Sequence, residues 1–570
     1  MSTTTTTPIS AEPAHRDRTS ASPAPRGAMH TLGILLRQRL RRDRWQLVIW
    51  LLSIALLALF SAESIQTTYG NAAGRVELLK LAIANPAILM LRGLPQGTGL
   101  GAVTFFEIFT FLALLAGLMS TFLAVRHSRA EEESGRAELV ASTPAARILP
   151  TVATLIHGVL ANAALAVLVG LGFIAAGLPA YGSFVAGAAV GGAGIAFLAV
   201  GLLLAQLMMT PRGANGFASA VVVLAYVLRG IGDATGTITG DGTHMRSAWP
   251  SWLSPIGWGE QSGAYTTNDW TPLLLDLGLA VVLMAVVFWL QSVRDSGAGF
   301  VPERAGRADA RSTLSGPLGL AWRLQWPTIL GWTVGGLFTG LLAGALGSVV
   351  SSSVANDPAL ANIRKALGTI GSGGSGPLTQ IFISAIFSIV GVLAAACATQ
   401  VIIRLRQEEA GGSAEIMMST PLSRVRWLLE FLLDGVIAVV LVLLAAGLAS
   451  GLSAVSAGEG ASIINDSFAA AAAQLPVAFV YLGMLALVFV VLPTWTIPVA
   501  WAALGLGAFI GIFGGLVGMP QWVKDLSPFS HAPVVVGTVD WTGGFWMFGI
   551  AIVATAAAAV LVKRRDFAIG

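Results

Sequence analysis

The segment EEESGRAELVASTP, residues 131–144, is a charged island between two long apolar stretches, and EEAGGSAEIMMSTP, residues 408–421, repeats it. Aligned without gaps, the 23 residues that begin at Val125 and the 23 that begin at Ile402 are identical at ten positions. Such a match within one chain indicates an internal repeat, and the repeat sets how the rest of the sequence is divided.

The composition is that of a membrane protein. Of 570 residues, 55% are hydrophobic and only 11% are charged, whereas soluble domains carry about 25% charged residues. A helix that crosses the roughly 30 Å hydrocarbon layer needs about 20 apolar residues. We therefore predict an all-α polytopic membrane protein, and its single cysteine, Cys397, should be a buried, inert thiol because it lies in an apolar run. The sequence offers twelve spans: 45–64, 103–125, 151–176, 183–208, 213–232, 271–293, 327–349, 377–402, 425–450, 468–492, 495–516 and 543–562.

An even number of spans places both termini on one side of the membrane. Most of the 33 Lys and Arg residues then fall on the side of the N-terminus. Positive charges concentrate in cytoplasmic loops, so we expect a multi-pass protein of the cell membrane with both termini in the cytoplasm.

Weaker matches surround the island in the same order. TLGILLRQ at 31–38 corresponds to PLGLAWRL at 317–324, and the chain leaves the last span of each half through VRD at 293–295 and RRD at 564–566. The arginine-rich start of the first half should be an amphipathic helix whose arginines meet lipid phosphate. The second half should also begin with an amphipathic helix. The predicted organisation is a disordered tail at 1–28, a first six-span half at 29–296, a cytosolic linker at 297–312 and a second, parallel half at 313–570.

Each island follows the second span of its half and therefore faces the cytosol. The Thr-Pro step ends one helix and begins the next. A short helix held between two spans would present Glu132 and Glu138, or Glu409 and Glu415, to a partner. An ordinary solvated loop is the alternative for a single copy, but two copies at matched depth favour a docking site.

These features resemble a known family. Six spans per half, a basic amphipathic start, and an EE-x-x-G-x-x-E turn that ends in STP-x-x-R are similar to permeases of the ABC-2 type. Two fused halves resemble the actinobacterial exporters of polyketide antibiotics and the related multidrug efflux permeases.

The resemblance implies that the turn is a coupling helix that sits in a cleft of a separate ATPase. The two copies differ, because Glu133 and Arg136 become Ala410 and Ser413, so the two docking sites need not be equivalent. The residues implied in ATPase coupling are Glu131, Glu132, Gly135, Glu138, Thr143, Pro144 and Arg147, and Glu408, Glu409, Gly412, Glu415, Thr420, Pro421 and Arg424.

The sequence indicates that the motor is a separate chain. A phosphate-binding loop needs Gly-Lys-Ser/Thr, and none of the four lysines follows a glycine. We predict no catalytic residue, no metal site and no cofactor in this chain. ATP and Mg²⁺ would be bound by the partner ATPase, in two copies per permease. The other expected partners are membrane lipids and a hydrophobic small-molecule substrate, without nucleic acid.

Polar and aromatic residues inside the spans are candidates for a substrate path. Ionisable residues there are costly and usually face a cavity or each other. His157 and Asp434 occupy equivalent places in the repeat, and whether they interact is left open. The candidates for the path are Phe105, Phe106, Glu107, Phe109, Phe382 and Phe387.

The predicted function is export of hydrophobic drugs, antibiotics or lipid-like molecules, driven by the separate ATPase. A proton-driven secondary multidrug carrier and an exporter dedicated to a cell-envelope lipid are the alternatives. The sequence does not identify the substrate.

Overall fold

The computed structural model describes residues 25–141, 147–240, 242–295, 297–301, 316–354, 377–514, 519–536 and 540–565. The chain divides into two compact units, Met1–Ala305 and Gly306–Gly570, and each is described by itself. The division falls within the predicted linker at 297–312.

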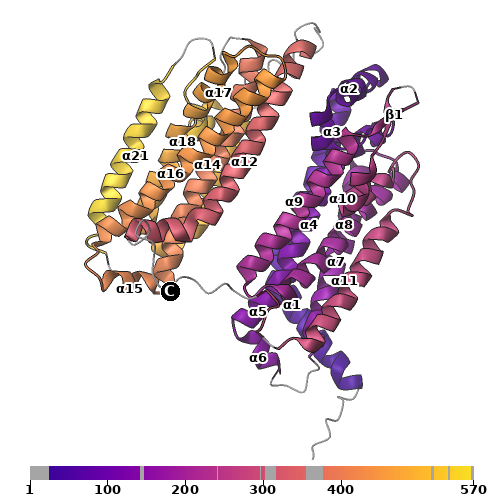
Figure 1. The fold of residues 1–570 in the computed structure, drawn as a ribbon, viewed down its shortest axis with the longest axis horizontal. Helices are drawn as coiled ribbons and strands as arrows, with labels where there is room; N and C mark the ends of the chain where they lie inside the picture. Colours follow the sequence, from indigo (N-terminus) through magenta and orange to yellow (C-terminus); the bar gives the residue numbers. More distant parts are fainter. Residues whose placement is uncertain are drawn as a thin grey trace, which may run out of the picture. The chain divides into compact units, whose positions relative to one another are not determined.

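The first unit is helical except for one short hairpin (Figure 1). Its α-helices are α1 (Pro25–Thr68), α2 (Ala72–Ala84), α3 (Pro86–Arg92), α4 (Leu100–Arg126), α5 (Arg129–Glu133), α6 (Arg136–Ala141), α7 (Leu149–Ala175), α8 (Ala180–Leu207), α9 (Pro211–Ala234), α10 (Pro255–Gln261) and α11 (Leu273–Val293). Strands β1 (Thr237–Thr239) and β2 (His244–Arg246) pair antiparallel, and a 3₁₀ turn, η1 (Trp249–Leu253), follows them.

Helices α4 and α8 form the centre of the first unit, where both are buried over most of their length. The small residues of α8 explain how its neighbours come so close. A side chain at Gly187 would meet the backbone of Ala166 in α7, and one at Gly201 would meet the backbone of Thr121 in α4. Small residues bring membrane helices into backbone contact in this way.

One end of the first unit carries α2, α3 and the hairpin, and the other carries α5 and α6 (Figure 1). A buried ion pair closes the former end, with Arg229 Nη1 3.0 Å from Asp233 Oδ2. Arg229 also donates to the carbonyls of Leu89 and Met90 in α3. Glu260 of α10 accepts a hydrogen bond from the Leu94 N–H at 2.6 Å, and burial raises the pKa of this carboxyl.

The second unit is also a bundle of long helices (Figure 1). Its α-helices are α12 (Pro317–Val354), α14 (Leu378–Ala410), α15 (Ser413–Met418), α16 (Arg424–Ser456), α17 (Ile463–Ala472), α18 (Leu475–Val491), α19 (Thr496–Ala508), α20 (Gln521–Lys524) and α21 (Thr542–Leu561). Shorter turns are η4 (Pro493–Trp495), the π-helical η5 (Phe509–Phe513) and η6 (Pro528–His531).

A row of glycines joins α12 to α16 in the second unit. Side chains at Gly336, Gly340 and Gly344 would each meet a backbone carbonyl of α16. The contact is therefore backbone against backbone, and these glycines serve packing within one bundle.

Among the described residues, twelve helices or helix pairs are long and apolar enough to span a membrane, as the sequence predicted. Cys397 is buried, also as predicted. The separate amphipathic helix expected at the start of the first half is not observed in the described residues. Residues 31–44 form part of the continuous helix α1, because no proline or glycine pair interrupts the helix before the apolar segment begins.

Candidate functional site

The acidic turn of the first unit is a helical reversal between α4 and α7. Helix α4 ends at Arg126, α5 follows after two residues, and Gly135 then takes a left-handed backbone with φ +72°. Its N–H donates to the carbonyl of Glu132 at 3.1 Å, and its own carbonyl accepts from the N–H of Glu138 at 3.2 Å. Glycine adopts this conformation without strain, so the first glutamates lie in α5 and Glu138 begins α6.

The second unit builds the same reversal. Helix α14 runs on to Ala410, and Gly412 has φ +77°. Its N–H donates to Glu409 O at 3.1 Å and its carbonyl accepts from Glu415 N–H at 3.2 Å. The repeated sequence therefore encodes one local geometry twice.

Two arginines fix the turn of the first unit. Arg129 is fully buried and pairs with Glu132, while Arg294, just beyond α11, pairs with the same carboxylate. Arg129 also donates to the carbonyls of Met209 at 2.9 Å and Gly297 at 3.1 Å. The turn is thereby tied to the connection between α8 and α9 and to the exit from α11.

The second unit repeats this arrangement. Arg406 Nη1 lies 3.2 Å from Glu409 Oε2, and Arg565, just beyond α21, pairs with the same glutamate. Arg565 also donates to Phe489 O at 3.0 Å, with its guanidinium 4.7 Å from the centre of the Phe489 ring. We call each set of one glutamate and two arginines an arginine clamp.

The last shared arginine of each island binds the backbone of one clamp arginine. Arg147 donates to the carbonyl of Arg294, and Arg424 donates to the carbonyl of Arg565. The resemblance implied Arg147 and Arg424 in coupling. In the structure, each of them holds the segment after the last helix of its half against the turn.

The structure corrects the expected orientation of two glutamates. We expected Glu132 and Glu409 to face a partner, but their side chains are only 19% and 0% exposed. Each of these carboxylates contacts two arginines in place of water. A buried carboxylate without such partners would be costly. Two glutamates that follow the glycine, Glu138 in α6 and Glu415 in α15, are exposed, and the neighbouring Ile416 is 74% exposed.

The other predicted turn residues take different places. Glu131 lies near Arg39 and 3.1 Å from Arg42 of α1, whereas Glu408 lies 2.5 Å from Arg404 of its own helix. In the second unit, Thr420 and Pro421 are exposed. Their counterparts Thr143 and Pro144 lie outside the described residues.

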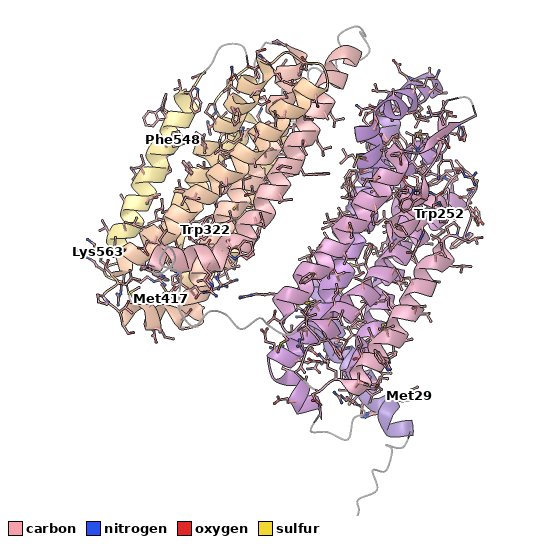
Figure 2. All side chains as sticks on the ribbon, viewed as in Figure 1. Met29, Trp252, Trp322, Met417, Phe548 and Lys563 are labelled. Carbon is pink, nitrogen blue, oxygen red and sulfur yellow. The ribbon has the colours of Figure 1, made fainter. Side chains whose placement is uncertain are left out.

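The sequence analysis did not predict that Arg294 and Arg565, which follow the last helix of each half, contact the acidic turn. Arg294 and Arg565 stand in the matching VRD and RRD exits, and that match was the available clue. In Figure 2, Met417 and Lys563 lie at the same end of the second unit, the end at which Arg565 pairs with Glu409.

The predicted substrate-path residues are buried within their own units. Phe105 and Phe109 stack with ring centres 4.5 Å apart, and Glu107 pairs with Arg92. Phe106 packs in a smaller cluster with residues of α2 and α3, while Phe382 and Phe387 are buried in α14. These positions suit packing, and their role along a path stays a prediction.

His157 has a partner that the sequence did not indicate. Its Nε2 lies 3.3 Å from Oδ2 of Asp43 in α1. Asp434, at the equivalent place in α16, is buried and neither of its carboxylate oxygens has a hydrogen-bond partner among the described residues.

Comparison with known proteins gives two consistent matches. The family model described as "Multidrug efflux system permease Rv1217c, C-terminal domain" matches residues 34–290 and residues 314–563, one segment in each unit. The chain is also 35% identical over 545 residues to the multidrug efflux system permease protein Rv1217c of Mycobacterium tuberculosis (strain ATCC 25618 / H37Rv). That alignment covers 95% of this chain and 96% of the relative.

Proposed function

Because the chain belongs to the family of multidrug efflux system permeases, we propose that it is the membrane subunit of an ATP-binding-cassette exporter. It moves hydrophobic drugs, antibiotics or lipid-like molecules out of the cell. The energy comes from ATP hydrolysis by a separate ATPase that docks on α6 and α15.

The duplicated arginine clamp carries this proposal. Each clamp fixes a short helix at one end of its unit, with Glu138 or Glu415 exposed in the first turn. A docking element has to transmit force, so it must be tied firmly to the spans. Each clamp ties its turn to the exit of the sixth span of its half through Arg294 or Arg565.

Exposed side chains supply the docking chemistry. Glu138 and Glu415 each offer an acidic contact, and Ile416 adds an apolar one on α15. An aliphatic side chain exposed beside a carboxylate at a helix tip suits a protein cleft with an apolar floor and a basic rim. The remaining differences between α6 and α15 allow the two docking sites to be unequal.

One chain offers both docking sites, so we propose one permease for two ATPase copies. The absence of a Gly-Lys-Ser/Thr segment in the sequence supports placing ATP and Mg²⁺ in that partner. Docking inside the cell puts the acidic turns and both termini on the cytoplasmic side of the membrane, in keeping with the excess of Lys and Arg there.

A proton-driven carrier is the competing function, and one vesicle experiment separates the two. Inverted membrane vesicles from cells that express the full chain with its native ATPase are incubated with a hydrophobic fluorescent dye in the medium, and uptake of the dye into the vesicles is measured. We expect dye transport to require ATP, to survive a protonophore and to be lost in the double variant Glu138→Arg/Glu415→Arg. Since both glutamates are exposed, the double variant should lose only about 0–1 kcal/mol of stability per site.

Glu77→Arg is the matched control, because it makes the same charge reversal at an exposed site of α2, at the other end of the first unit. It should transport as the native chain does. Transport that persists without ATP and collapses with the protonophore would establish the secondary carrier. Full transport by the double variant at equal expression would remove α6 and α15 as docking helices.

A further inference from the structure

Three buried polar residues of the first unit converge behind the acidic turn. Asp43 lies in α1, His127 directly follows α4, and His157 lies in α7; they are 2%, 1% and 0% exposed. Nε2 of His127 contacts Oδ2 of Asp43, and Nε2 of His157 lies 3.3 Å from that oxygen. Two imidazole nitrogens and one carboxylate oxygen thus face a common point, with all three atoms within 4.8 Å of one another.

The neighbouring groups orient these side chains. Nδ1 of His127 lies 3.4 Å from Oε1 of Glu131, and Oδ1 of Asp43 lies 3.1 Å from Nε of Arg126. A histidine that binds a metal commonly directs its second ring nitrogen to a carboxylate, which fixes the ring and raises its basicity. The Glu131–His127 contact has that form.

We propose that Asp43, His127 and His157 form a binding site for one divalent transition-metal ion of the Zn²⁺ type. Two imidazoles and one carboxylate suit zinc, cobalt or nickel, whereas calcium and magnesium prefer oxygen ligands alone. A water molecule would complete a four-coordinate site. The ion joins α1, α4 and α7 at the point where the acidic turn begins.

The spacing of the ligands explains why the sequence shows no metal motif. Asp43 is 84 positions from His127 and 114 positions from His157. Asp43 lies in α1, His127 directly after α4 and His157 in α7. Only the packing of α1 against α4 and α7 brings them together.

The positive charges of nearby arginines would repel a metal ion, but each arginine has a carbonyl or carboxylate partner. Arg39 donates to the carbonyls of Pro150 and His127, Arg42 pairs with Glu131, and Arg126 pairs with Asp43. The charges of Arg42 and Arg126 are thus balanced in part by these carboxylates.

The second unit supplies an internal control. Residue 157 corresponds to Asp434 in the repeat, His127 to Arg404, and extension of the match at 31–38 puts Ile329 opposite Asp43. An aliphatic side chain and an arginine cannot replace the two lost ligands. The inference therefore concerns the first half alone.

Zinc binding to the full-length purified protein tests the site. The protein is stripped with a chelator, dialysed against Zn²⁺, and its metal content is measured by mass spectrometry. We expect about one Zn²⁺ per chain in the native protein and in Asp434→Asn. Asp43→Asn and His157→Gln, which keep the side-chain size, should bind at least about tenfold more weakly.

Co²⁺ substitution in the native protein gives a readout that does not depend on whether the variants fold. Two nitrogens and two oxygens around Co²⁺ should produce visible d–d absorption that Zn²⁺ abolishes. Absence of this absorption, together with native zinc content no higher than that of His157→Gln, would overturn the proposal. Equal loss of zinc in Asp434→Asn would overturn it as well.

Discussion

In the first half Glu132 lies between Arg129 and Arg294, and in the second half Glu409 lies between Arg406 and Arg565. Both carboxylates meet one arginine from three residues earlier and one from the exit of the last helix. The two clamps differ in exposure, because the Glu409 side chain is fully buried and that of Glu132 is 19% exposed. The same contacts should therefore contribute differently to stability in the two halves.

The regions behind the clamps differ more. The first half places the polar group Asp43, His127 and His157 there. At the corresponding sequence positions the second half has Ile329, Arg404 and Asp434, and the Asp434 carboxylate has no hydrogen-bond partner among the described residues. The two halves thus share the clamp contacts that hold the exposed helices α6 and α15. The buried residues next to the turn can differ between the halves, since different sets of well-packed side chains can support the same turn.

The largest difference should come from removing the clamp carboxylates. Glu409→Gln removes the carboxylate charge that Arg406 and Arg565 both contact in a buried site and should cost about 3–5 kcal/mol of unfolding free energy. Glu132→Gln should cost about 1–3 kcal/mol, because water reaches its clamp. Thermal unfolding of the two purified variants, followed by tryptophan fluorescence, measures the order.

Glu77→Gln, an exposed site on α2, is the control and should leave the melting temperature unchanged. Equal losses at Glu132 and Glu409 would show that exposure does not distinguish the two clamps.

A smaller difference should appear where the first helix of each half packs on the third. An alanine Cβ at Gly340 in α12 would overlap the backbone of Ala446, so Gly340→Ala should cost about 1–3 kcal/mol as an overpacked contact. An alanine at Gly172 in α7 would lie 3.1 Å from the Ala55 carbonyl of α1, a contact that a slight helix shift relieves. Gly172→Ala should therefore cost less than about 1 kcal/mol.

Denaturant unfolding of both variants in detergent measures this contrast. Gly331→Ala is a control on α12 itself, since a Cβ there meets nothing within 4 Å. A Gly340→Ala variant as stable as Gly331→Ala would contradict the backbone contact.

The smallest effect should be the same in both halves. The sequence DWT occurs at 269–271 and 540–542, before the last helix of each half. Asp269 accepts from Thr271 N–H at 2.9 Å and Asp540 from Thr542 N–H at 2.8 Å, which lowers the pKa of both carboxyls below the ordinary 3.8.

A carboxyl with a lowered pKa in the folded state stabilises the fold above its ordinary pKa, and this contribution is lost as the pH falls through the folded value. Asp269→Ala and Asp540→Ala should each lower the melting temperature slightly at pH 6, and the two losses should shrink together below pH 3.8. Melting curves at both pH values test this. A loss that grows on acidification would contradict it.

The sequence predicted the architecture because the relevant properties are local. Span length and hydropathy predicted the twelve membrane helices found among the described residues. The repeated island predicted a repeated turn, and the left-handed glycines that build it, at 135 and 412, need no distant partner. The excess of arginine around the first apolar segment suggested a separate helix, but helix α1 continues through it because helix continuity depends on backbone hydrogen bonds rather than on the side-chain face.

The direction in which each charged side chain points was decided only by the tertiary structure. Glu132 and Glu138 stand six residues apart in one acidic turn, yet one is clamped and the other is exposed. The clamp partner Arg294 is 162 residues from Glu132, and Asp43 is 114 residues from His157. The Glu132 carboxylate pairs with the arginines that the packed helices bring to it, because leaving it buried and unpaired would be costly. The local sequence therefore predicts the turn itself. Which of its side chains are buried and which are exposed depends on the helices packed around it.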